Sequence, residues 1–360
     1  MKHFEDTHAK HHDHSALKVQ QGIAQPPIVN PNFVRKQRRE LSVEEYVEGI
    51  LNGNIVILGQ AITMVESALD SHKEMAQKII EGCLPYSGKS VRVGITGVPG
   101  AGKSTFIEAI GSMVTGEGRK LAVLAIDPSS QRSRGSILGD KTRMESISHN
   151  PNVFIRPSPS GNSLGGVARK TRETVVLCEA AGFDTIFIET VGVGQSEVAV
   201  HSMVDIFLML QISGAGDELQ GIKRGIMEMS DIIAITKADG ANVDKAGLTK
   251  VQIENALMLF PMPQSGIRPK VMLCSSVEGT GLKELWDSVK NFLLMTQNFE
   301  SNRARQSMYW MRETINESLL SGFYNSPLVK ERMVEIERKV LSSELSPFTA
   351  ASDLLDIYNA

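Results

Sequence analysis

The sequence contains no apolar run approaching the about 18–20 residues of a membrane-spanning helix, and its first residues lack the apolar core of a secretory signal. Its three cysteines lie far apart and form no CxxC pair, so we expect neither a disulfide framework nor a zinc site. The formal net charge is only -3, which gives no reason to expect nucleic acid as a partner. These absences favour a cytoplasmic protein in a reducing compartment, with no membrane element.

Histidine is concentrated at the N-terminus, where five of the eight histidines fall within the first fourteen residues: His3, His8, His11, His12 and His14. Such a segment either binds metal or is a polar, disordered tail without special chemistry, and we favour the tail. Pro26, Pro27 and Pro31 follow without a sustained period, so residues 1–40 are interpreted as a tail and linker.

Helical patterns flank the centre of the chain. Ser42 and Glu45 have the S-x-x-E spacing of a capping box, and helical periodicity follows, so we expect a helical module over 41–88. After residue 298 two apolar stripes recur at helical spacing, which predicts a helical region over 299–360 that needs a partner surface on the main domain or another subunit. The stripes are Met308, Met311, Ile315 and Leu319, and Leu328, Val329, Met333, Ile336 and Val340.

Short apolar runs alternate with helix-like stretches over 89–298. They are Val91–Thr96, Leu121–Asp127, Val153–Arg156, Thr185–Glu189, Ile206–Ile212, Ile232–Thr236 and Val271–Ser275. Fully apolar strands alternating with helices predict an α/β domain with a mainly parallel sheet covered on both faces. Ligands of such sheets bind beyond the carboxyl ends of the strands, so we look there for functional residues.

A phosphate-binding motif, G-x-x-x-x-G-K-[ST], follows the first predicted strand and precedes an amphipathic helix, which is the context it requires. Its glycines let main-chain N–H groups surround phosphates, and the helix N-terminus favours their negative charge. We expect Lys103 to reach the β- and γ-phosphates and the Ser104 hydroxyl to bind Mg²⁺. The motif comprises Gly97, Val98, Pro99, Gly100, Ala101, Gly102, Lys103 and Ser104.

Magnesium and the hydrolytic water need carboxylates near this loop. Asp127 and Glu189 each end an apolar strand, and Asp140 lies in the loop Gly135–Thr142. Each of the first two is either a catalytic or metal-binding carboxylate or an ordinary helix N-cap, and Asp140 has the weakest independent case because it also suits the cap of a turn.

Two glycine-containing segments have the composition of switch loops, because glycine permits movement when a γ-phosphate is lost. In Glu189–Glu197, Gly192 and Gly194 supply this freedom, and Gln195 either orients the attacking water or is a solvent-exposed amide. The segment Ser213–Gly221, with Lys223 behind it, is either a switch and partner contact or an ordinary connection; its charged candidates are Asp217 and Glu218.

The residues Thr236-Lys237-Ala238-Asp239 resemble the N-K-x-D signature of GTPases, in which the lysine stem packs on the base and the aspartate accepts from guanine. Thr236 replaces the asparagine and cannot supply the same amide contacts. Asp239 favours guanine, because adenine presents no matching pair of donors, although a turn residue before Gly240 is the alternative. Ser275, Ser276 and Val277 resemble the S-A-x loop that offers an N–H to guanine O6. GTP is therefore favoured over ATP.

Taken together, the sequence resembles the MeaB/ArgK-type GTPases that accompany adenosylcobalamin-dependent methylmalonyl-CoA mutase. The likeness runs from about residue 42 to the end of the chain. It is carried by GVPGAGKST (97–105), AIDPSSQRSRGSILGDKTRM (125–144), IRPSPSGNSLGGVARKTRET (155–174), IETVGVGQSE (188–197) and GAGDELQGIKRGI (214–226).

This resemblance implies a GTP- and Mg²⁺-dependent homodimeric chaperone that gates loading of the cobalamin cofactor and protects or reactivates the mutase. The C-terminal helices would form a dimerisation arm. Residue by residue, it implies that Lys103, Ser104 and Thr105 hold phosphate and that Asp239 reads the base. It also implies magnesium and switch roles for Asp127, Asp140 and Glu189, and a partner-sensing switch at 214–226.

Two rival functions remain. A nickel-inserting GTPase would explain the histidine-rich tail, but Cys178 and Cys274 stand alone, without the Cys-His pair such a protein places near its switches. A small-molecule kinase would use the same phosphate loop, but it would need an acceptor-binding lid and would have no use for the Asp239 loop.

Overall fold

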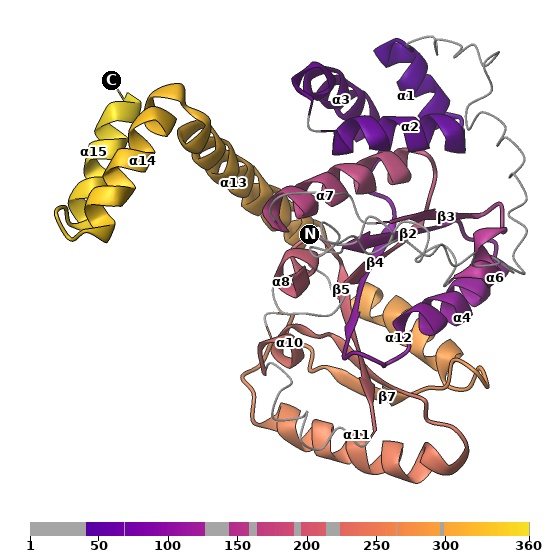
Figure 1. Cartoon of the computed structure of the whole chain (residues 1–360). Coiled ribbons are helices and arrows are strands. Elements are labelled where there is room, and N and C mark those ends of the chain that lie inside the picture. Colours follow the sequence, from indigo (N-terminus) through magenta and orange to yellow (C-terminus); the bar gives the residue numbers. More distant parts are fainter. Residues whose placement is uncertain are drawn as a thin grey trace, which may run out of the picture. The chain divides into compact units, whose positions relative to one another are not determined.

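The protein is described by a computed structural model (Figure 1) that covers residues 41–67, 69–126, 144–157, 164–190, 196–213, 224–263, 265–295 and 299–359. In this part of the chain, seven strands form one parallel sheet in the order β3-β2-β4-β1-β5-β6-β7. The strands are β1 (Val91–Gly97), β2 (Leu121–Ile126), β3 (Val153–Arg156), β4 (Thr185–Thr190), β5 (Ile206–Ile212), β6 (Ile232–Thr236) and β7 (Lys270–Leu273). The α/β prediction is confirmed, because each apolar run forms a strand with bounds shifted by at most two residues.

Helices cover both faces of this sheet. One layer is formed by α4 (Lys103–Gly116), α6 (Glu145–Ser148) and α12 (Leu282–Met295). The other is formed by α7 (Leu164–Ala180), α8 (Ser196–His201), α10 (Arg224–Met229) and α11 (Val243–Met258). Within β5, Leu208 and Leu210 belong to the core with α4 and α12, whereas Met209 packs with residues of α10 and α11. Burial on both faces explains why the strand sequence is continuously apolar.

The N-terminal helices α1 (Val43–Leu51), α2 (Ile55–Glu66) and α3 (Asp70–Cys83) pack on one another and on α7, and a 3₁₀ turn (Leu84–Tyr86) follows them. The predicted capping box is present: the Ser42 N–H donates to the Glu45 carboxylate at 2.9 Å, and the Glu45 N–H donates to the Ser42 hydroxyl at 3.2 Å. Arg156 at the end of β3 forms an ion pair with Glu66. The module is thus joined to the sheet by charge as well as by packing.

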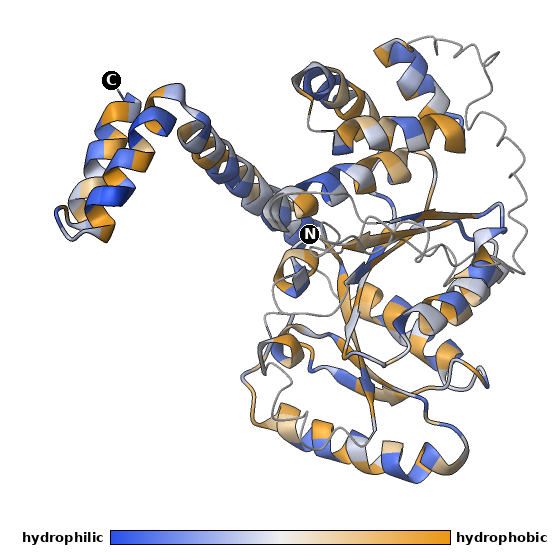
Figure 2. Cartoon of the chain, viewed as in Figure 1, coloured by the Kyte–Doolittle hydropathy of each residue, from blue (hydrophilic) through white to orange (hydrophobic). Residues whose placement is uncertain are grey.

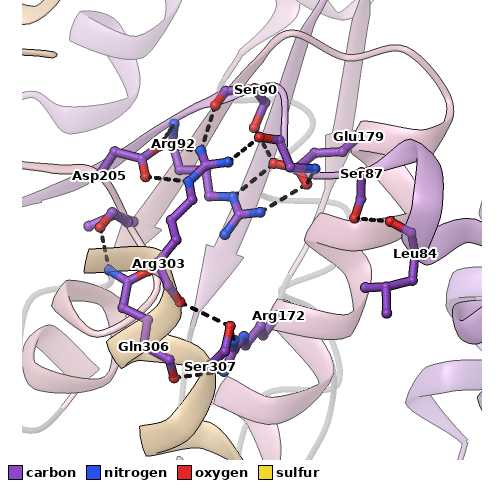
Figure 3. Close-up of polar contacts among 12 residues, drawn as sticks. Leu84, Ser87, Ser90, Arg92, Arg172, Glu179, Asp205, Arg303, Gln306 and Ser307 are labelled. Atoms are coloured by element: carbon purple, nitrogen blue, oxygen red, sulfur yellow. Dashed lines mark hydrogen bonds and ion pairs between the residues drawn. The ribbon is translucent and has the colours of Figure 1, made fainter. Parts of the chain in front are cut away.

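The long helix α13 (Phe299–Asn325) is attached to the segment that joins α8 to β5 (Figure 3). The Arg303 guanidinium donates to the Asp205 carboxylate at 2.9 and 2.7 Å. The Gln306 side chain donates to the Val204 carbonyl at 2.7 Å, and the Trp310 indole donates to the Ser202 carbonyl at 3.0 Å. Three successive turns of α13 therefore hold main-chain or carboxylate acceptors before β5.

The last two helices, α14 (Pro327–Leu341) and α15 (Pro347–Asn359), pack against each other. Their small core contains Val329 and Ile336 from the second predicted stripe, together with Ala350 and Leu354 from α15. That stripe therefore has a partner within its own region, in a helix that the sequence pattern had not separated. Hydrophobic and hydrophilic residues alternate along these helices in Figure 2.

The first predicted stripe behaves differently, because its four residues on α13 are each about half exposed: Met308, Met311, Ile315 and Leu319. This helix of 27 residues also carries charged side chains, among them Arg312, Glu313 and Glu317. None of the helices in the described ranges combines the length and apolar character needed to cross a bilayer.

Candidate nucleotide site

The phosphate loop connects β1, at the centre of the sheet, to α4. Gly100 and Gly102 both have φ of +78°, a conformation that favours glycine. At Gly97 a side chain is excluded for a different reason, because an added Cβ would lie 2.6 Å from the Leu210 carbonyl oxygen of the neighbouring strand. These glycines bring main-chain N–H groups to the start of a 14-residue helix, where an anion is favoured.

Lys103 is the first residue of α4, and its amine donates to the Gly97 carbonyl at 3.0 Å, across the base of the loop. Burial lowers the pKa of the Lys103 amine, whereas the carboxylates of Glu189 and Glu197 act to raise it. The two carboxylates therefore partly offset the effect of burial on the pKa of Lys103. Ser104 and Thr105 follow it in the first turn of the same helix.

Glu189 lies one residue before the end of β4, between Ile95 of β1 and Ala125 of β2 in the strand register. The structure therefore places it beside the strand that carries the phosphate loop. Ile126, the residue before Asp127, pairs with Thr190 in the same register.

Glu197 was not among the residues predicted from the sequence, yet it is 2% exposed and its charge acts on Lys103. It is the last residue of the candidate switch segment Glu189–Glu197 and lies in the first turn of α8 (Ser196–His201). A signal was available: an acidic residue two positions after Gln195, at the start of a helix. That pattern is also typical of an ordinary helix N-terminus, so it does not identify the contact.

The base-reading segment begins at Thr236, the last residue of β6, which bonds to the phosphate loop. Thr236 is 2% exposed, and its hydroxyl donates to the Ala101 carbonyl at 2.8 Å and to the Gln211 carbonyl at 3.1 Å. Lys237 has φ of +56°, and its Cε lies 4.0 Å from where a Cβ on Gly102 would be. The sequence analysis considered only that threonine cannot make the amide contacts of asparagine. The structure shows that the Thr236 hydroxyl forms a hydrogen bond to the phosphate loop.

Asp239 is held by the second base-reading loop. The buried Ser275 hydroxyl donates to the Asp239 carboxylate, and the Glu278 N–H donates to the Ser275 oxygen at 3.1 Å. The Ala238 N–H donates to the Cys274 carbonyl at 3.1 Å, so the two loops are also joined by main chain. Ser276 is partly buried and Val277 is 85% exposed. Two segments that are distant in sequence thus meet at one carboxylate.

Several predicted residues lie outside the described part of the chain: Asp127, Asp140, Gly192, Gly194, Gln195, Asp217, Glu218 and Lys223. The structure does bring together the phosphate loop, Glu189, Lys237, Asp239 and Ser275–Val277 at the carboxyl ends of β1, β4, β6 and β7. Ligand recognition at that edge is what a parallel sheet favours.

The cysteines are buried in the core. Burial raises the pKa of the Cys83 thiol to about 11 and that of Cys274 to about 12, and it also raises the pKa of Cys178. A thiol binds metal as its thiolate, so such residues make poor ligands. Among the described residues, no group of three or more His, Cys, Asp or Glu side chains is arranged to hold a metal ion.

The chain matches a family model, several sequence relatives and a solved structure. A family model described as methylmalonyl Co-A mutase-associated GTPase MeaB matches residues 58–327. A probable GTPase of Mycobacterium tuberculosis is 47% identical over 321 residues, covering 88% of this chain and 96% of that relative. The mitochondrial methylmalonic aciduria type A homolog of Mus musculus is 45% identical over 331 residues, covering 88% of this chain and 80% of the relative. The crystal structure of a LAO/AO transport system kinase matches with a TM-score of 0.69 and 34% identity, covering 90% of this chain and 100% of that one.

Proposed function

The chain belongs to the methylmalonyl-CoA mutase-associated GTPase family, MeaB, and from that premise we propose that it is a chaperone gating adenosylcobalamin loading of methylmalonyl-CoA mutase or a related acyl-CoA mutase. It binds guanine nucleotide and hydrolyses GTP, as a member of this family. We propose in addition that GTP turnover protects the mutase and helps to exchange damaged cofactor. The observation that best supports a nucleotide-controlled role is the direct bond between the base loop and the phosphate loop, from Thr236 to Ala101.

Phosphate binding is assigned to the main chain of Gly97–Gly102 and to Lys103, Ser104 and Thr105. The amine of Lys103 needs little rearrangement to contact phosphate, because it already lies across the loop on the Gly97 carbonyl. A positive group held where charge develops stabilises the transition state more than a mobile one does. Burial lowers the pKa of this lysine, and Glu189 and Glu197 oppose that shift by favouring its charged form.

Magnesium is assigned to Ser104, Glu189, Asp127 and Asp140. The two of these that the structure describes, a hydroxyl and a carboxylate, offer the hard oxygen atoms that Mg²⁺ prefers, so the donor set fits the ion. The ion, when bound, would neutralise part of the charge on the phosphates. We assign to Gln195 the orientation of the attacking water. Gly192 and Gly194 would give its loop the freedom to respond to the γ-phosphate.

Guanine recognition is assigned to Lys237, Asp239 and the loop Ser275–Val277. The Ser275 hydroxyl fixes one oxygen of the Asp239 carboxylate and so orients the other for the base. The stem of Lys237 lies near Gly102, where it would form one wall for the purine ring. The orientation of Asp239 supports guanine specificity, because it preorganises an acceptor that adenine cannot use, whereas the Lys237 wall would suit any purine.

The mutase contact is assigned to the segment after β5, with Asp217, Glu218 and Lys223, and the homodimer contact to the C-terminal helical arm over 299–360, which includes α13. The support for the dimer is the half-exposed stripe of Met308, Met311, Ile315 and Leu319, because an apolar row of this kind usually needs a partner. A light-scattering measurement of the purified chain tests the dimer. A monomeric mass at micromolar concentration rejects it.

One experiment tests the proposal as a whole. The chain is used as bait in an extract of its source organism, once with GDP and once with a non-hydrolysable GTP analogue, and captured proteins are identified. We expect a cobalamin-dependent acyl-CoA mutase whose recovery depends on the nucleotide.

Two further measurements address the rival functions. Equal displacement of bound GTP by ATP would instead support a kinase. GTP hydrolysis that responds to nickel in the full chain but not in a variant lacking residues 1–40 would support a nickel-inserting protein, and a response unchanged by the deletion would reject it.

A further inference from the structure

The side chain of Asn242 lies between two loops of the nucleotide site and uses both ends of its amide. Its Nδ2 donates to the Lys237 carbonyl at 2.6 Å, and its Oδ1 accepts from the Ser213 hydroxyl at 2.6 Å. Its own N–H donates to the Asp239 carbonyl at 2.9 Å. One residue thus contacts both ends of the segment Lys237–Asp239 and the end of a different strand.

Lys237 needs such a contact because its backbone is strained. Its φ of +56° lies in the left-handed region, which is costly for a residue with a side chain. Within the described ranges, Ser343 is the only other non-glycine residue with positive φ. The conformation turns the Lys237 stem toward Gly102 of the phosphate loop. A bond that fixes the Lys237 carbonyl therefore also fixes the wall assigned to the base.

Ser213 connects the Asn242 contact to the segment that we assign to the mutase. It is the residue directly after β5 and directly before 214–223, the segment assigned to the mutase. The preceding residues are also tied to the base loop, because the Gln211 carbonyl accepts from the Thr236 hydroxyl. A displacement of Ser213 therefore either breaks its hydrogen bond to Asn242 or moves the Asn242 side chain with it.

We propose that Asn242 is a positioning residue that couples Ser213, at the end of β5, to the guanine loop, so that movement at Ser213 changes how firmly the nucleotide is held. The proposal rests on the assignment of Lys237 and Asp239 to the base. It predicts that loss of either hydrogen bond of the Asn242 amide speeds the release of GDP. The effect requires no change in the residues that contact the nucleotide.

The chemistry of the amide supplies matched variants. Asn242→Ala removes both bonds. Asn242→Asp keeps the acceptor for Ser213 but replaces the donor to Lys237 with an oxygen that repels the carbonyl. Ser213→Ala removes only the link to β5, and Ser213→Thr keeps a hydroxyl. Asn325→Ala serves as the control, because Asn325 also uses both ends of its amide, with the Ser321 and Lys330 side chains, but does so at the junction of α13 and α14.

The dissociation rate of a fluorescent GDP analogue is measured for each variant of the full chain. One hydrogen bond corresponds to roughly a 3- to 10-fold change in an equilibrium or rate. We expect such an increase for Asn242→Ala, Asn242→Asp and Ser213→Ala, and wild-type rates for Ser213→Thr and Asn325→Ala. The double variant Asn242→Ala/Ser213→Ala should release GDP no faster than Asn242→Ala, because the second change removes a bond already lost.

Any one of three results would overturn the coupling. The GDP dissociation rate could be unchanged in Asn242→Ala, or unchanged in Ser213→Ala. The rate increase in the double variant could also equal the product of the two single increases, which would mean that the two residues act independently. Thermal unfolding in the absence of nucleotide is followed in parallel, and a purely structural role predicts lower stability without faster release. The base assignment fails separately, if the wild-type chain binds ADP as tightly as GDP.

Discussion

The Thr236 hydroxyl donates to the Ala101 carbonyl at 2.8 Å, and the two residues are 135 positions apart in the chain. Ala101 lies inside the phosphate loop and Thr236 directly before Lys237, so this bond joins the two loops that we assign to the two ends of a nucleotide. The same hydroxyl also contacts the Gln211 carbonyl of β5. Threonine therefore replaces the asparagine of the usual signature with a shorter group that still joins the loops.

Replacing Thr236 with valine should destabilise the protein by about 1–3 kcal/mol, because it removes the donor from two carbonyls at a site that is 2% exposed. Denaturant unfolding measures the loss, and GDP titration should show weaker binding. Thr236→Ser keeps the hydroxyl and should resemble the wild type in both. Equal stability of the valine and serine variants contradicts the role of the bond.

Lys103→Ala should slow GTP turnover by about 10²–10³-fold, because it removes a positive group from the charge that develops on the phosphates. The side chain contributes one bond, to the Gly97 carbonyl, and little packing, so the circular dichroism spectrum should stay unchanged. Single-turnover hydrolysis is the measurement. Near-normal turnover by the folded variant rejects the assignment of the phosphate site.

Asp239→Asn should shift the preferred base from guanine to xanthine. The new amide donates where the carboxylate accepted, and xanthine carries a carbonyl where guanine carries its exocyclic amine. Ser275 still finds an oxygen acceptor in the asparagine, so the loop contact is retained. Competition between GTP and XTP for a fluorescent nucleotide measures the switch. An unchanged order of affinity means that Asp239 does not contact the base.

Arg303→Met should cost about 3–5 kcal/mol of stability, because it leaves the Asp205 carboxylate, whose side chain is 1% exposed, without its ionic partner. In the double variant Arg303→Met/Asp205→Asn the charge is gone as well, and part of the stability should return. Urea unfolding of the three proteins is compared. A double variant no more stable than the single one shows that the ion pair is not the cause.

Asp231 should make stability depend on pH. Burial raises its pKa to about 7, although a hydrogen bond from the Phe207 N–H opposes the shift. Because the folded pKa lies above the unfolded value, the contribution of Asp231 is present below about pH 4 and is lost as pH rises through 7. Asparagine does not ionise in this range, so the Asp231→Asn variant should not lose this stability as the pH rises.

The variant should therefore exceed the wild type by about 2–4 kcal/mol at pH 8 and lose that advantage near pH 4. Unfolding free energies are measured at several pH values with the wild type alongside. A constant difference across the range is inconsistent with titration of this carboxyl.

The sequence was sufficient for features that are encoded by contiguous residues. The strands were predicted because burial on both faces of a parallel sheet requires an uninterrupted apolar run, as in Ile206–Ile212. The phosphate loop was predicted for a similar reason, since its glycines, lysine and helix N-terminus are consecutive.

The tertiary structure decided which distant residues meet. The bonds from Thr236 to Ala101 and from Asn242 to Ser213 depend on β1, β5 and β6 being neighbours in the sheet, and no local pattern encodes that order. The burial of Glu197 and the packing of Val329 on α15 depend in the same way on how helices cover their partners. A motif fixes the chemistry available at a position, whereas strand order and register fix what that chemistry contacts.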